Sequence, residues 1–214
     1  MQHEDRIERV GAKWQAEGAG QHYRGPRFGS RRARERDPAT VRALLERCEG
    51  VTSVLDVPCG AGRLAHAVRE HGARWSGVDV SHAMLASAPA DCAPHRAQAS
   101  LSALPFRARQ FDAVVCCRFL HHLQDRAAFE RAAAELARVS RRYVIASFWD
   151  SASLPALRVR LGLKRSEGPS GRAATSRAFV EQCFSRVGMR VVAFRAHARF
   201  ISQQTFVLLE HGER

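Results

Sequence analysis

The feature that most constrains this chain is a short apolar run that leads directly into a glycine turn. Val51–Val57 is rich in β-branched residues and predicts a buried strand. Gly60 and Gly62 follow, and Arg63–His71 has the apolar spacing of a helix that stops at Gly72. Glycines let a ligand approach the backbone, and the first turn of a helix offers unpaired N–H groups. A strand, a glycine turn and a helix in this order therefore predict a ligand site.

Strands and helices alternate in the same way along much of the chain. Further strands are predicted at Trp75–Val80, His95–Ala99, Phe111–Cys117 and Tyr143–Phe148. Helices are predicted after two capping residues, Asp37 and Ser81, whose side-chain oxygens accept backbone N–H groups, and over Asp125–Val139. Repeated alternation predicts right-handed βαβ units and a parallel sheet that helices cover on both faces.

The C-terminal part departs from this alternation. Residues 150–174 are basic and contain several glycines, so they are predicted as a loop, and a helix capped by Thr175 or Ser176 follows. Met189–Ala196 and Ile201–Glu210 are separated by a few residues and are predicted to pair as an antiparallel hairpin. The predicted fold class is α/β: a Rossmann-like, doubly wound sheet of seven mostly parallel strands that ends in an antiparallel hairpin.

Positive charge is the main compositional signal. The 214 residues include 34 Lys or Arg against 21 Asp or Glu, for a formal charge of +13. Nearly all the basic residues are arginine, which a GC-rich genome tends to encode, so codon usage is one explanation of the charge. The other explanation is functional: the arginines would bind an anionic partner such as nucleic acid, a phosphorylated sugar or an acidic membrane. Arginines gather in Arg24–Arg36 and Arg158–Arg172, and we expect both segments near the open edge of the sheet. Residues 1–36 are assigned to a basic N-terminal arm or lid and residues 37–214 to one domain.

Other sequence features concern the compartment and metals. No apolar run of about 18 residues exists that would span a membrane, and the first residues lack the apolar region of a secretory signal. The six cysteines show no C-x-x-C pair and no zinc-ligand spacing. Reduced thiols, a cytoplasmic location and no metal site are therefore expected.

Two acids flank the predicted ligand site. Asp79 ends the second strand, nineteen residues after Gly60, where a carboxylate binds the ribose of a nucleotide in doubly wound folds. Residues 60–65 formally satisfy the dinucleotide fingerprint G-x-G-x-x-A, which keeps an NAD-dependent dehydrogenase as an alternative. Asp56 argues against it, because a carboxylate beside the turn would repel a pyrophosphate but suits an ammonium group. S-adenosylmethionine has such a group and no phosphate.

The segment Val54–Arg63 resembles the first motif of the class I S-adenosylmethionine-dependent methyltransferases, especially their small-molecule branch, in a Pro-Cys variant. Residues 99–106, 110–115 and 120–123 are similar to later motifs, so the resemblance covers roughly residues 40–148. One departure is Ser100, which stands where the family often has an acid that recognises adenine.

The resemblance implies S-adenosylmethionine as the cofactor. Asp56 and the glycine turn would hold its methionine part, Asp79 its ribose, and Val80 with Met84 its adenine. The expected cofactor-binding residues are, in chain order, Asp56, Pro58, Gly60, Ala61, Gly62, Asp79, Val80, Met84, Ser100, Leu101, Cys117 and Arg118.

Catalytic candidates follow the fourth strand, because ligands of open α/β sheets bind beyond the carboxyl ends of the strands. His121 or His122 is expected to take a proton from a hydroxyl or amine, since histidine titrates near neutral pH. The predicted function is methyl transfer from S-adenosylmethionine to a small-molecule acceptor, with an anionic acceptor as one option. The acceptor atom and the oligomeric state stay open.

Two other functions fit the same motifs. An RNA methyltransferase would use the arginines for phosphates, but an aromatic fraction of 7% leaves few platforms for stacking bases. A non-catalytic protein that binds S-adenosylmethionine would also tolerate the Pro-Cys variant and Ser100.

Overall fold

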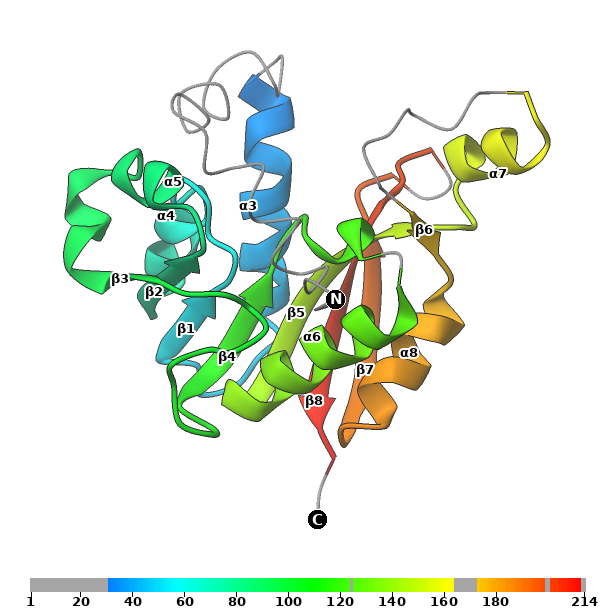
Figure 1. The fold of residues 1–214 in the computed structure, drawn as a ribbon. Helices are drawn as coiled ribbons and strands as arrows, with labels where there is room; N and C mark the ends of the chain where they lie inside the picture. Colours follow the sequence, from blue (N-terminus) through cyan, green and yellow to red (C-terminus); the bar gives the residue numbers. More distant parts are fainter. Residues whose placement is uncertain (1–30, 124, 164–172, 199–200, 213–214) are drawn as a thin grey trace, which may run out of the picture.

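The computed structural model describes residues 31–123, 125–163, 173–198 and 201–212, and its centre is one mixed β-sheet (Figure 1). The order across the sheet is β3-β2-β1-β4-β5-β8-β7, and the short β6 pairs with β5 off this path. The strands are β1 Ser53–Asp56, β2 Arg74–Asp79, β3 Arg96–Gln98, β4 Phe111–Cys116, β5 Ser140–Asp150, β6 Ala174–Thr175, β7 Met189–Ala196 and β8 Gln204–His211. The pairs among β1 to β6 are parallel, whereas β8 is antiparallel to both β5 and β7. The predicted fold class is confirmed, with the two-residue β6 as an addition.

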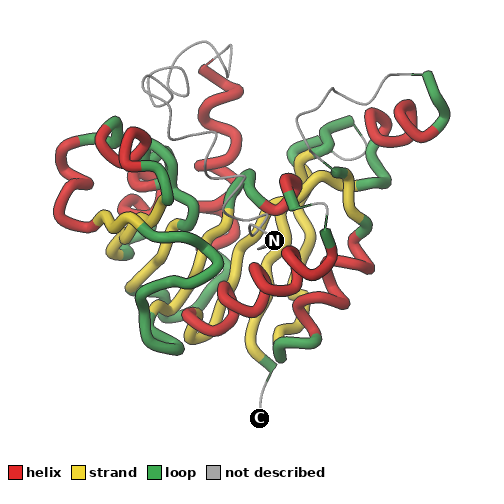
Figure 2. The backbone as a smooth tube through the Cα atoms, in the orientation of Figure 1, coloured by secondary structure: helices red, strands yellow, loops and turns green. Residues whose placement is uncertain are grey.

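Helices cover both faces of this sheet, as the tube in Figure 2 shows. They are α3 Arg31–Leu45, α4 Ala65–Glu70, α5 His82–Ala86, α6 Arg126–Val139, α7 Leu154–Arg160 and α8 Arg177–Ser185, with 3-10 turns at Ala90–His95 and Leu120–His122. Alternate residues of β4 serve two cores, because successive side chains of a strand point to opposite faces. Val114 and Cys116 pack with α6 and α8, while Ala113 and Val115 pack with α3 and α4. No helix among the described residues is long and apolar enough to cross a membrane.

Two predicted helix caps, Ser81 and Ser176, are confirmed, and the structure adds a third at Asp125. The Ser81 hydroxyl accepts the N–H of Met84 at 3.2 Å, and the Ser176 hydroxyl accepts that of Phe179 at 3.1 Å. The Asp125 carboxylate accepts two N–H groups at the start of α6. Each predicted cap is a local signal, which is why the sequence reveals it.

The prediction that Asp37 caps a helix is wrong. Helix α3 already runs from Arg31, so Asp37 and Pro38 lie inside it. Pro38 removes one backbone donor, and the Thr40 hydroxyl donates to the carbonyl of Arg36 at 2.9 Å. The boundary drawn between residues 36 and 37 therefore falls within α3, while residues 1–30 of the proposed arm lie outside the described part of the chain.

The prediction that residues 150–174 form only a loop is also wrong. Ser153 accepts the N–H of Ala156 at 3.4 Å and caps α7, with Pro155 in its first turn. Ala174 and Thr175 then pair with the end of β5 as β6. Both elements are short, and a seven-residue helix or a two-residue strand leaves too little periodicity to identify.

Candidate functional site

The turn after β1 has the backbone conformation that its glycines allow. Gly60 and Gly62 have φ values of +55° and +70°, in the left-handed region that favours glycine. The Cys59 N–H donates to the carbonyl of Val78 at 2.8 Å, which holds the turn against β2. The turn thus lies at the carboxyl edge of the sheet, where α/β folds bind ligands.

Asp79 joins the end of β2 to this turn. One carboxyl oxygen accepts the N–H of Gly60 at 2.8 Å, and the other accepts the N–H of Ser81 at 2.9 Å. Burial raises the pKa of Asp79, and these hydrogen bonds partly offset the effect. The N–H of Val80 also contributes, and since a carboxylate accepts about four hydrogen bonds, Asp79 keeps capacity for a further donor.

Asp56 is buried at the end of β1, and only one of its two carboxyl oxygens accepts a hydrogen bond from the described residues. Its Oδ2 accepts the indole N–H of Trp75 at 3.2 Å, whereas Oδ1 has no partner among the described residues. Burial raises the pKa of Asp56 to about 7, although the Trp75 hydrogen bond and the charge of Arg63 act in the opposite direction. A buried carboxylate oxygen without a donor costs free energy, and it fits a ligand that brings a cationic N–H.

Gly77 makes room for the indole that holds Asp56. A Cβ at Gly77 would lie 2.3 Å from Cη2 of Trp75 and 2.9 Å from Sγ of Cys59. We expect Gly77→Ala to displace the indole from Asp56 and to lower the free energy of unfolding by about 2 kcal/mol. Chemical denaturation measures the loss, and tryptophan fluorescence reports the displaced ring. Ser76→Ala is the matched control on the same strand; full stability with an unchanged emission spectrum in Gly77→Ala would contradict the prediction.

The predicted adenine-side residues lie beside the ends of β2 and β3. Met84 and Leu101 are buried, and Val80 is half-buried. The N–H of Ala99 donates to the carbonyl of Asp79 at 3.2 Å, which keeps this segment against β2. The hydroxyl of the half-buried Ser100 lies 2.8 Å from that of Ser102. The predicted residues of β1, β2 and the segment after β3 therefore meet along one edge.

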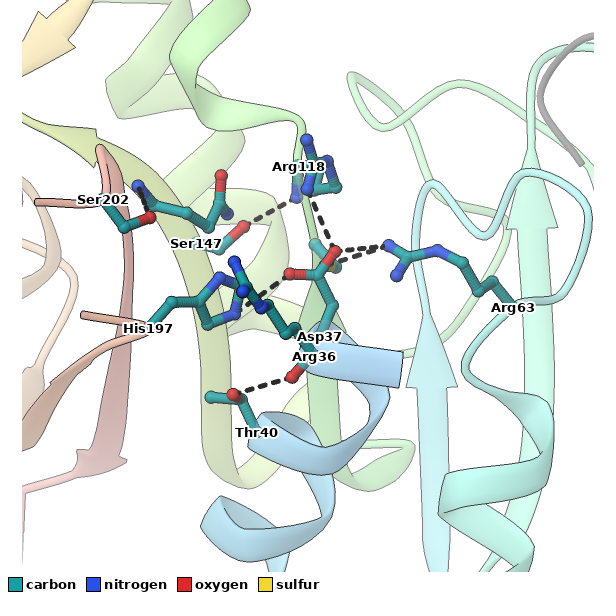
Figure 3. Close-up of polar contacts among 10 residues, drawn as sticks. Arg36, Asp37, Thr40, Arg63, Arg118, Ser147, His197 and Ser202 are labelled. Carbon is teal, nitrogen blue, oxygen red and sulfur yellow. Dashed lines mark hydrogen bonds and ion pairs between the residues drawn. The ribbon is translucent and has the colours of Figure 1, made fainter. Parts of the chain in front are cut away.

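Cys117 and Arg118 follow β4 at the same edge. Cys117 is buried, with Sγ 3.8 Å from Nη2 of Arg63. Arg118 has a φ of +60°, and its N–H donates to the hydroxyl of Ser147 on β5 at 2.7 Å. The Arg118 guanidinium points toward α3 (Figure 3).

A buried ionic cluster centred on Asp37 is the part of the site that sequence reasoning missed. Asp37 Oδ2 lies 2.8 Å from Nη2 of Arg63 and 3.2 Å from Nη1 of Arg118, and Oδ1 lies 3.1 Å from Nε2 of His197 (Figure 3). Only 1% of the Asp37 side chain is exposed. Burial alone would raise the pKa of Asp37, but His197, Arg63 and Arg118 together hold it well below its usual range. The cluster ties α3, the glycine turn, β4 and the end of β7 together.

His121 and His122 lie in the 3-10 turn after β4, and both are buried. The His121 ring stacks on Trp149 of β5, with centroids 4.7 Å apart and planes 3° from parallel. The two imidazole rings are 4.3 Å apart. The pair therefore lies at the carboxyl ends of β4 and β5, as predicted, with His121 held by an aromatic partner.

A glycine turn after β1, an acid at the end of β2 and an antiparallel β8-β7 edge together define a Rossmann-like methyltransferase fold. A family profile described as "Methyltransferase domain" matches residues 54–142. These residues span β1 to the start of β5 and include most of the predicted site.

Curated relatives support this class. The ubiquinone biosynthesis O-methyltransferase of Serratia proteamaculans is 30% identical over 111 residues, which cover 47% of this chain and 45% of the relative. The enzyme of the same name from Stutzerimonas stutzeri is 34% identical over 92 residues, or 39% of this chain and 38% of the relative. The matched part therefore spans less than half the length of these relatives.

Solved structures match over nearly the whole chain. The magnesium protoporphyrin IX methyltransferase of Synechocystis PCC 6803 with bound SAH has a TM-score of 0.76 at 17% identity, and the match covers 96% of this chain and 99% of that one. An S-adenosylmethionine-dependent methyltransferase from Archaeoglobus fulgidus has a TM-score of 0.67 at 16% identity, with 89% and 99% covered. The predicted resemblance is confirmed: residues 54–142 match a methyltransferase domain, and the fold is that of the class I S-adenosylmethionine-dependent methyltransferases.

Proposed function

We propose that this protein transfers a methyl group from S-adenosylmethionine to a small molecule. The observation that carries the proposal is Oδ1 of Asp56, a buried carboxylate oxygen without a partner among the described residues, beside the glycine turn. The amino group of S-adenosylmethionine is the kind of donor that this oxygen lacks. A pyrophosphate would instead bring negative charge against it, so the dinucleotide alternative is disfavoured.

The remaining cofactor contacts follow from the same arrangement. The backbone of Pro58, Gly60, Ala61 and Gly62 would lie along the methionine part, and Asp79 has capacity for the ribose hydroxyls. The adenine would lie between Val80, Met84 and Leu101, with Ser100 as a hydrogen-bonding partner, while Cys117 and Arg118 would close the site from β4. When bound, the cofactor supplies a methyl carbon on a cationic sulfonium.

Titration calorimetry with S-adenosylmethionine and with NADH tests the cofactor. We expect binding of S-adenosylmethionine alone, and we expect Asp56→Ala to abolish it. Binding of NADH without S-adenosylmethionine would overturn the proposal. Formation of S-adenosylhomocysteine in a metabolite extract, lost in Asp56→Ala, would exclude a protein that binds the cofactor without catalysis.

We propose His121 and His122 as the candidate bases, since both lie where an acceptor would approach the sheet edge. His121→Phe keeps a ring against Trp149 but removes the titrating nitrogens. If His121 is the base, kcat for a hydroxyl acceptor should fall by about 100-fold or more while the affinity for S-adenosylmethionine stays unchanged. His122→Phe is the matched variant, and the pH profile of kcat should lose its acidic limb only in the variant that removes the base. Unchanged kcat in both variants would exclude both.

An anionic acceptor remains part of the proposal. Arg63 and Arg118 bring two guanidinium groups to this edge of the sheet, where positive charge attracts an anionic compound. Matched phenols with and without a carboxyl group test it. We expect a lower KM for the acidic compound and expect Arg118→Gln to remove the difference; equal KM values in the unaltered protein would contradict it.

We also propose a cytoplasmic location, and the buried thiols support it. All six cysteines are free and buried, which fits a reducing compartment.

A further inference from the structure

The large apolar side chains that are exposed in the described part of the chain gather at one corner. They are Leu154, Leu161, Leu163 and Ile201, with exposed fractions of 46%, 60%, 74% and 70%. The first three lie on α7 and the residues after it, and Ile201 lies in the turn between β7 and β8. Scattered exposed leucines are ordinary, but a group of this kind marks an interaction surface.

The two segments that carry these residues are neighbours. Ser153, which caps α7, and Ser202, which follows Ile201, line the same cavity of about 180 Å³. The Asp150 N–H before α7 also donates to the carbonyl of Gln203 at 2.7 Å. Figure 1 shows α7 beyond the carboxyl ends of the strands, next to the β7–β8 turn. The four side chains therefore belong to one patch.

Helix α7 contributes little to the core beneath it. None of its residues is buried, although four of the seven are Leu, Ala or Val. Ala156, Leu157 and Val159 are half-buried, whereas Leu154 is exposed and available to another surface.

The same patch is positively charged. Arg158 and Arg160 are exposed on α7, between the exposed leucines. In the sequence from Ser151 to Arg172 there are five bases and a single acid, Glu167. We call Leu154, Arg158, Arg160, Leu161, Leu163 and Ile201 the corner patch.

The chemistry of the corner patch selects among partners. RNA recognition uses aromatic side chains to stack bases, and the exposed apolar residues here are all aliphatic. A second copy of this chain would bring arginine against arginine. A bilayer with anionic lipids matches both kinds of side chain in the patch. The leucines can enter the boundary of the acyl chains, and the arginines can reach the lipid phosphates.

We propose that the corner patch docks this protein on the surface of an anionic lipid bilayer. Docking is peripheral and reversible, because the patch holds only four large apolar residues and two described arginines. The carboxyl edge of the sheet, where α7 follows β5, then lies close to the lipid headgroups.

Vesicle co-sedimentation of the full chain tests this proposal. The vesicles contain phosphatidylcholine alone or with roughly 30% phosphatidylserine. We expect the protein to bind the anionic vesicles and not the neutral ones, with affinity that falls as salt rises. Equal binding to both kinds of vesicle, or binding to neither, would overturn the proposal.

Two double variants separate the contributions of the patch. Arg158→Glu with Arg160→Glu should weaken binding by about 25-fold or more, from about fivefold for each basic residue near the surface. Leu161→Ser with Leu163→Ser removes the two leucines after α7 and should weaken binding by about tenfold. If the leucine variant binds vesicles as well as the unaltered protein, binding is purely electrostatic, and the proposal that apolar residues enter the bilayer is overturned.

The matched control is Arg47→Glu with Arg74→Glu, which makes the same charge change near the other end of the strands. Both residues are exposed, and we expect this variant to bind vesicles nearly as well as the unaltered protein. An equal loss in the control would mean that the overall charge of +13 drives binding. Bulk RNA retained by the unaltered protein and lost in the corner variants, without vesicle binding, would identify a nucleic-acid surface instead.

Discussion

Asp56→Asn is expected to weaken the binding of S-adenosylmethionine by about 100-fold or more, because removing one partner of a buried charge pair costs about 3–5 kcal/mol. The unaltered carboxyl has Oδ1 without a donor among the described residues and a pKa raised to about 7 by burial. A cationic amino group favours the ionised form, so binding below about pH 7 must release a proton. The affinity of the unaltered protein should therefore fall about tenfold for each pH unit below 7, and the affinity of Asp56→Asn should not. Calorimetry across this range measures both.

The same substitution is expected to stabilise the unliganded protein. The pKa of Asp56 is higher in the folded chain than in the unfolded one, so the folded state loses stability as the pH rises from about 4 through 7. At about pH 8 the buried charge is fully present, and Asp56→Asn should raise the free energy of unfolding by about 2–4 kcal/mol. Urea denaturation at several pH values measures the gain, which should vanish below about pH 4.

Asp112→Asn is the matched control for this prediction. Asp112 is an acid at the start of β4, and its carboxylate accepts hydrogen bonds from Thr52, Ser53 and Arg141. Its loss should lower stability and leave the affinity for S-adenosylmethionine unchanged. Unchanged affinity in Asp56→Asn, or a flat pH profile in the unaltered protein, would contradict the assignment of Asp56 to the amino group.

The sheet was predictable because its signals are local. The β-branched run before the glycine turn predicted β1, and the caps Ser81 and Ser176 predicted where two helices begin. Each depends on residues within one turn of chain, so neighbouring positions suffice to find it. The antiparallel hairpin followed from the few residues between its strands.

Elements whose limits depend on distant partners were not predictable. Asp37 and Pro38 have the local pattern of a helix start, yet α3 continues through them. The Asp37 carboxylate is held by Arg63 and His197, and no spacing rule brings positions 37 and 197 together. Asp56 and Asp79 were placed correctly at the ends of their strands, because the chain from the glycine turn to the end of β2 forms one local unit; their binding roles stay predictions.

Asp37→Asn is expected to cause the largest loss of stability, because it leaves Arg63, Arg118 and His197 around a neutral side chain. Removing one partner of a buried ion pair costs about 3–5 kcal/mol, and the side chains of Arg63 and Arg118 are only 17% and 29% exposed. For a chain of this size the melting temperature should fall by roughly 8–15 °C. Calorimetric unfolding measures it, and Glu46→Gln is the control directly after the same helix, because Glu46 is 61% exposed and pairs with Arg42 at 3.8 Å.

The pH dependence distinguishes this ionic role of Asp37 from simple packing. The pKa of Asp37 is depressed in the folded chain, so its contribution is complete above the unfolded value near 4 and is lost as the pH falls below it. The unaltered protein and Asp37→Asn should therefore differ most near neutral pH and converge in acid. Equal melting temperatures at neutral pH, or a difference that persists unchanged in acid, would mean that Asp37 does not hold α3 to the sheet through its charge. Because Arg63 follows the glycine turn directly, a confirmed loss would also identify Asp37 as the residue that couples α3 to the proposed cofactor site.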